Sequence, residues 1–159
     1  MTMLRRTLYI LFATTAVALT VAACGDGRVF DKFVSTPVDG LEKNDTVSFS
    51  VPPVASSGSY CQEIGLRITA DYPFTSISLE VKQTVEPGHR VSTDTLACRL
   101  YGDDGNLLGH GVSMFQYGFA LPDINLQKGD SLHVRVRHVM KREILPGITD
   151  IGFSLEARR

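Results

Sequence analysis

Apolar and polar residues alternate at every second position through most of the chain beyond residue 44, and this pattern limits the fold more than any other feature. The alternating segments lie near 47–51, 60–70, 77–85, 91–101, 131–140 and 151–155. A period of two places successive side chains on opposite faces of a β-strand. Pro-, Gly- and Asp-rich turns separate the segments. We therefore predict an all-β fold, a single antiparallel β-sandwich of about seven or eight strands with a jelly-roll-like order, although periodicity alone does not separate a sandwich from a barrel.

The N-terminal segment follows a different pattern, that of an export signal. Arg5 and Arg6 precede a mainly apolar stretch of twelve residues, Leu8–Leu19, which is too short for a membrane-spanning helix of about 20 residues. The sequence VAAC, which ends at Cys24, matches the lipobox of bacterial lipoproteins. We expect cleavage between Ala23 and Cys24, with diacylglyceryl and acyl groups on the Cys24 thiol and amine as the membrane anchor and no other cofactor. The alternative is an ordinary secretory signal followed by a chance cysteine.

These patterns divide the chain into three parts. Residues 1–23 form the signal peptide, residues 24–43 a lipidated tether, and residues 44–159 the β-sandwich domain. After cleavage 136 residues remain, which suits one domain with a core of its own. They carry 14 lysines and arginines against 17 acidic residues, a net charge of −3. A nucleic-acid partner is not expected, since such proteins usually carry a basic excess.

Strand alternation also predicts the environment of the two other cysteines and of two histidines. Cys61 falls on the face opposite Ile64, whereas Cys98 falls on an apolar face, so we expect two unpaired thiols rather than a disulfide. His133 and His138 are five positions apart within one strand, and this odd spacing places them on opposite faces and prevents joint metal binding.

We expect neither catalysis, nor a bound metal, nor a small-molecule substrate. The chain has no His-x-Glu, Cys-x-x-Cys or Gly-x-Ser-x-Gly motif. The acidic stretch at residues 103–106 lacks the further carboxylates of a calcium loop and is typical of a hairpin turn.

Several segments stand in a distinctive order and spacing, namely the lipobox at Cys24, Leu66-Arg67 with Tyr72-Pro73-Phe74, Asp94-Thr95-Leu96, residues 104–109 with Gly111, and above all residues 140–152. In this order and spacing they resemble the GldH family of gliding-motility lipoproteins of Bacteroidota. The resemblance implies a non-enzymatic envelope lipoprotein that is associated with gliding motility and with the type IX secretion machinery. Other envelope or gliding lipoproteins would then be its partners. We expect an outer-membrane anchor that faces the periplasm.

Two candidate interaction surfaces follow from the charge pattern and from the segment most like the family. Arg135 and Arg137 lie on the outward face of one predicted strand, and Lys141 and Arg142 follow it. A solvated strand face is the alternative to a contact surface for an anionic partner.

Leu145 and Ile148 place apolar groups in a Pro-Gly loop, where they either cover the end of the core or contact a partner. The first interpretation is favoured.

Two further hypotheses concern carbohydrate. Phe115, Tyr117 and Phe119 share a strand face and could form the platform of a carbohydrate-binding β-sandwich, which is the alternative function, although core packing is the commoner reason for such a stripe. Thr46, Thr95 and Ser131 each follow an aspartate and precede an aliphatic residue, as in the sequence that Bacteroidota O-glycosylate. Strand starts would explain the same three tripeptides.

Overall fold

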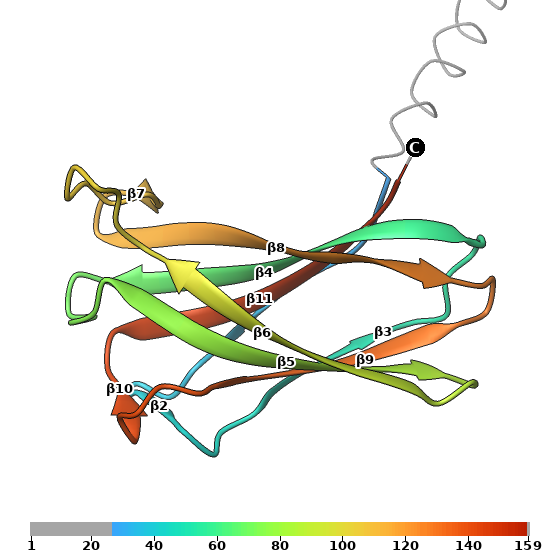
Figure 1. Cartoon of the computed structure of the whole chain (residues 1–159), viewed down its shortest axis with the longest axis horizontal. Helices are drawn as coiled ribbons and strands as arrows, with labels where there is room; N and C mark the ends of the chain where they lie inside the picture. The colour runs from blue at the N-terminus through green and yellow to red at the C-terminus, as the bar shows by residue number, and fades with distance from the viewer. Residues whose placement is uncertain (1–26, 159) are drawn as a thin grey trace, which may run out of the picture.

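Two antiparallel β-sheets pack face to face in the computed structural model, which describes residues 27–158 (Figure 1). The strands are β1 (Arg28–Ser35), β2 (Leu41–Glu42), β3 (Val47–Val51), β4 (Gly58–Thr69), β5 (Ser76–Glu86), β6 (Arg90–Arg99), β7 (His110–Gly111), β8 (Met114–Leu126), β9 (Ser131–His138), β10 (Ile144–Leu145) and β11 (Ile148–Ala157). Three of the eleven strands contain only two residues, which leaves eight long ones. The predicted all-β class is confirmed. Within the described residues no helix is long and apolar enough to cross a membrane.

The strand order is that of a jelly roll. One sheet has the order β1-β11-β4-β8-β7 and the other has the order β3-β9-β5-β6. Counted along the chain, the eight long strands have the order first, eighth, third and sixth in one sheet and second, seventh, fourth and fifth in the other. The two-residue strands β2 and β10 pair with each other across one end of the sandwich. The sheets do not close into a barrel, so the structure settles the choice that periodicity left open.

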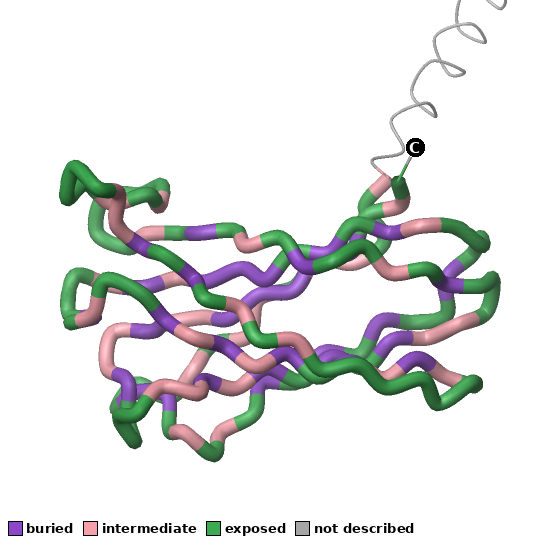
Figure 2. Tube along the Cα trace, viewed as in Figure 1, coloured by how far each residue is buried: buried purple, intermediate pink, exposed green. Residues whose placement is uncertain are grey.

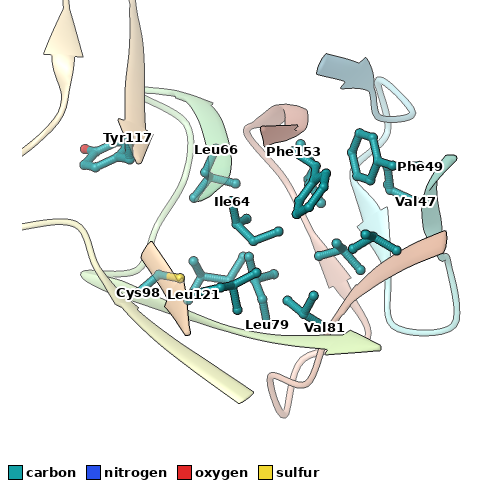
Figure 3. Packing of buried hydrophobic residues seen from close by; sticks show 14 of the residues in the cluster. Val47, Phe49, Ile64, Leu66, Leu79, Val81, Cys98, Tyr117, Leu121 and Phe153 are labelled. Atoms are coloured by element: carbon teal, nitrogen blue, oxygen red, sulfur yellow. The ribbon is translucent and has the colours of Figure 1, made fainter. Parts of the chain in front are cut away.

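The core lies between the sheets and is built from the inward positions of the alternating strands (Figure 2). In β5, for example, Ile77, Leu79 and Val81 are buried while the residues between them are not. Phe49 of β3 meets Phe153 of β11 across the interior, with ring centroids 5.9 Å apart (Figure 3). Removal of this apolar surface from water is the main stabilising contribution to the sandwich.

The prediction of a tether over residues 24–43 is corrected, because β1 and β2 lie within it. Strand β1 pairs with β11 from Arg28 to Ser35, with one irregularity between Arg28 and Phe30, and Phe30 and Val34 pack against the core. The sequence pattern hides this strand because Phe33 points outward, against the apolar alternation. An ideal Cβ added to Gly65 or Gly152 would lie 2.5 or 2.7 Å from the Phe33 ring, so the ring lies directly on the backbone of two neighbouring strands. The described domain therefore begins near Arg28 rather than at residue 44.

Candidate functional site

The outward face of the four-stranded sheet carries the predicted basic residues. Arg135 and Arg137 lie on β9, on the opposite face from the buried Val134 and Val136. Lys82 of β5 lies directly opposite Arg135 in the antiparallel register. The predicted outward orientation of the two arginines is confirmed, and the pairing adds Lys82, which the sequence did not connect with them.

Arg137 is neutralised by a carboxylate on the neighbouring strand. Its Nε donates to Glu80 Oε1 at 2.7 Å and its Nη2 donates to Glu80 Oε2 at 3.1 Å. These hydrogen bonds lower the pKa of Glu80 and raise that of Arg137, because each favours the charged form of its partner. Arg137 is therefore held in a fixed geometry by Glu80 and contributes little free positive charge.

Arg135 and Lys82 are two cations that face each other, and neither is held by a carboxylate of the described chain as Arg137 is, although the charge of Lys82 also lowers the pKa of Glu80. No carboxylate of residues 27–158 lies within 4.0 Å of either side chain. Like charges directly opposite on neighbouring strands are destabilising. Arg135 and Lys82 line a shallow depression of about 260 Å³. Its other walls are Asn44, Thr46, Glu80 and Arg137. Two cations beside an amide and a hydroxyl form a suitable surface for a carboxylate or phosphate group.

The other predicted surface residues do not join this depression. Lys141 and Arg142 are exposed in the loop between β9 and β10. Leu145 is fully buried and Ile148 is 3% exposed, so neither side chain is accessible to a partner in this structure, against the alternative interpretation of an interaction surface. They cover the end of the core, as the favoured interpretation predicted, because the β2–β10 pair folds this loop back over the sandwich. Gly147 makes the necessary turn with a φ of 79°.

The predicted faces of the histidines and cysteines are confirmed. His133 is exposed beside Ser50, while His138 is completely buried. Cys61 is exposed and Cys98 is buried, and both are free thiols. Burial raises the pKa of Cys98 to about 12, so this thiol stays protonated at neutral pH.

The aromatic stripe faces the core and not the solvent. Phe115 and Phe119 pack against the core cluster, and Tyr117, which is buried, stacks on Phe119 at a centroid distance of 6.1 Å. Core packing is therefore the right explanation of the stripe, and the stripe offers no platform to a sugar ring.

A separate open groove of about 940 Å³ is lined by Thr75, Arg99, Tyr101 and Asp103, among others. Sequence reasoning missed this groove because only the fold brings the 75–76 segment beside the end of β6.

The acidic stretch at residues 103–106 forms the predicted turn. Gly105 has a φ of 78°, and Asp104 accepts hydrogen bonds from the backbone and side chain of Asn106 at 3.1 and 2.8 Å. These hydrogen bonds lower the pKa of Asp104. Within the described residues no group of three or more His, Cys, Asp or Glu side chains is placed to hold a metal ion.

The three candidate glycosylation residues occupy different positions. Thr46 and Ser131 lie where β3 and β9 start, as expected, but Thr95 lies in the middle of β6. Thr46 and Thr95 are exposed, whereas Ser131 is partly buried. The proposed lipid-attachment residue Cys24 and the cleavage position after Ala23 lie outside the described residues.

The fold and the surface together define a jelly-roll domain with basic residues on one sheet face. Comparison with known proteins shows the family to which the chain belongs. The sequence model of the GldH lipoprotein family matches residues 28–155. The chain belongs to this family, as the sequence resemblance predicted. It is 29% identical over 148 residues to the gliding motility lipoprotein GldH of Flavobacterium johnsoniae, an alignment that covers 89% of this chain and 92% of that protein.

Two of the similar solved structures illustrate the distant likenesses. The family 35 carbohydrate-binding module of Clostridium thermocellum aligns with a TM-score of 0.44 and 10% identity, over 77% of this chain and 78% of that one. The globular domain of zebrafish complement 1qA protein aligns with a TM-score of 0.43 and 12% identity, over 82% of this chain and 96% of that one.

Proposed function

We propose that this protein is a non-enzymatic, lipid-anchored docking subunit of the gliding and type IX secretion machinery, and that it binds an anionic region of another envelope protein through Arg135 and Lys82. The observation that carries the proposal is the facing pair of cations, neither of which forms an ion pair with a carboxylate of residues 27–158. Such a pair weakens the free sheet and is relieved when a carboxylate or phosphate binds between them. Membership of the GldH lipoprotein family supports the envelope location and the association with gliding.

A charge-reversal experiment tests the docking surface. Tagged protein carrying Lys82→Glu and Arg135→Glu is expressed in place of the native chain, and partners are recovered from solubilised membranes and identified by mass spectrometry. We expect the double variant to lose a partner that the native protein retains. Lys32→Glu combined with Lys128→Glu, at two exposed positions outside this depression, changes the net charge by the same amount and is the matched control. Equal recovery of every partner by the double variant would refute the proposal, provided that its melting temperature is unchanged.

The anchor is proposed to be the lipid on Cys24, in the outer membrane and facing the periplasm. Cys24→Ser removes the thiol that accepts the diacylglyceryl group, so we expect an unprocessed precursor or a released protein. Mass spectrometry of the N-terminal peptide measures the lipid directly. Protease treatment of intact cells measures the side of the membrane, and degradation of the domain would contradict the periplasmic orientation.

O-glycosylation at Thr46, Thr95 and Ser131 remains a proposal. The exposed positions of Thr46 and Thr95 are accessible to a transferase, while Ser131 is less so. The intact mass of the native protein decides the matter, since a mass equal to peptide plus lipid excludes glycans at all three positions.

A further inference from the structure

The segment between the proposed lipid and the folded domain is very short. Three peptide steps join Cys24 to Gly27, and at 3.3–3.6 Å per residue they span at most about 11 Å. The carbonyl oxygen of Gly27 accepts a hydrogen bond from the Ala157 amide at 2.7 Å, which fixes Gly27 at the end of the five-stranded sheet. A lipid on Cys24 would therefore hold this end of the sandwich close to the membrane surface.

Three turns lie at the same end of the sandwich. The strand register places the β3–β4 loop (residues 52–57), the β5–β6 turn (87–89) and the β8–β9 turn (127–130) at the same end of the strands as the start of β1, and Figure 1 shows all three on the side of the sandwich toward which the C-terminus lies. Hydrogen bonds connect two of these turns. The Lys128 amide donates to Ser57 Oγ at 2.8 Å, and the Val54 amide donates to the Asp130 carbonyl at 2.9 Å. The tethered end is thus a cross-linked surface and not a set of independent loops.

The two ends differ in charge. The loops at the opposite end carry six carboxylates against three cations, namely Asp39, Asp45, Asp71, Asp103, Asp104 and Glu143 against Lys43, Lys141 and Arg142. At the tethered end Asp130 is paired with Arg90 at 3.3 Å, and no carboxylate of residues 27–158 pairs with Lys128. An anionic lipid surface would repel the acidic end and tolerate the tethered end.

We infer that the end bearing the β3–β4, β5–β6 and β8–β9 turns faces the lipid headgroups of the anchoring membrane, an inference that rests on the lipidation of Cys24 proposed above. The thirteen residues of β8 then span about 40 Å from this surface to the β7–β8 turn. The loops that most resemble the family, at residues 104–111 and 140–148, lie at the far end. The Arg135–Lys82 face runs along the side of the sandwich, where the membrane leaves it accessible to a partner.

Distance-dependent quenching tests the orientation. Lipidated full-length protein is reconstituted into vesicles of zwitterionic and anionic phospholipids that contain nitroxide-headgroup lipid. Cys61→Ser removes the exposed native thiol, and a fluorophore is attached at Ala55→Cys, in the β3–β4 loop, or at Val112→Cys, a 95% exposed position beside β7. Cys98 is buried and stays unlabelled. We expect at least several-fold stronger quenching at position 55 than at position 112. Equal quenching, or stronger quenching at position 112, would overturn the inference.

A linker variant tests whether the short tether sets the orientation. Twenty Gly and Ser residues inserted after Gly25 extend the tether by roughly 25 Å on average, so quenching at position 55 should fall toward that at position 112. An unchanged contrast would refute the role of the tether. The mass of the N-terminal peptide is measured on the same samples. A chain without lipid there refutes the proposed anchor, whereas a lipidated chain with the reverse quenching pattern refutes the orientation alone.

Discussion

Gln83 of β5 donates its side-chain amide to the side-chain oxygen of Gln62 of β4, at 2.6 Å, and so joins the two sheets through a largely apolar core. Both residues are buried. Gln62 in turn donates to the carbonyl oxygen of Pro122 at 2.8 Å, beside the point where the β4–β8 register shifts. A buried amide is tolerated only when its donors and acceptors find partners.

The glutamine pair should behave as a unit in a double-mutant cycle. Gln62→Leu leaves the Gln83 amide without its partner, so we expect it to lower the free energy of unfolding by about 1–3 kcal/mol. Gln83→Leu should cost a similar amount. The double variant is expected to cost clearly less than the two single changes together, because both orphaned groups are removed. Urea denaturation measures the three values, and additive losses would show that the two amides are not coupled.

Phe33 should hold β1 on the sheet. Its ring lies on Gly65 and Gly152, and the guanidinium carbon of Arg67 lies 3.8 Å from the ring centroid. Phe33→Ala removes this cover and the cation–π contact, and we expect a loss of about 1–3 kcal/mol in unfolding free energy. Phe33→Tyr keeps the ring and serves as the control. Thermal melting of the two variants makes the comparison, and a native-like Phe33→Ala would imply that β1 adds little to the domain.

Leu145 and Ile148 should be required for folding and not for recognition. Replacing both by Ser opens the covered end of the core and buries hydroxyl groups, so we expect a loss of several kcal/mol. Ile144→Ser in the same loop is the control, because Ile144 is 44% exposed. It should change the melting temperature little. If the double variant melted like the native protein, the packing assigned to this loop would be wrong.

His138 should make the domain sensitive to acid. Its ring is completely buried, and neither ring nitrogen has a hydrogen-bond partner in the described part of the chain. Burial lowers its pKa. The backbone carbonyls of Leu41 and Glu143 and the carboxylate of Glu143 raise it by a smaller amount, and the nearby Lys43 lowers it further. The unfolded chain binds this proton near pH 6.5 and the folded chain binds it only at lower pH, so stability falls as the pH drops below about 6.5.

The measurement is the free energy of unfolding between pH 7.5 and 5. One such group contributes a slope of at most about 1.4 kcal/mol per pH unit. His138→Phe should remove this contribution, whereas His133→Phe, at an exposed position of the same strand, should leave it intact. The same pH dependence in the native protein and in His138→Phe would assign the acid sensitivity to other groups.

The sequence by itself determined the parts of this protein that depend on local pattern. Alternation placed Val134 and Val136 inward and Arg135 outward, because a strand turns successive side chains to opposite faces whatever its neighbours are. The same rule separated His133 from His138 and Cys61 from Cys98. The order of short segments around residues 104–111 and 140–152 identified the family, because that information is linear.

Only the tertiary structure decided what depends on pairing between distant segments. Lys82 and Arg135 are more than fifty positions apart, and their opposition follows from the β5–β9 register, which no local pattern encodes. Strand β1 was hidden because Phe33 points away from the core, and its outward position makes sense only beside Gly65 and Gly152 of two other strands. Pairing between distant strands places these groups together. Such pairing forms only when the packing of the two sheets buries enough apolar surface to offset the conformational entropy that the chain loses.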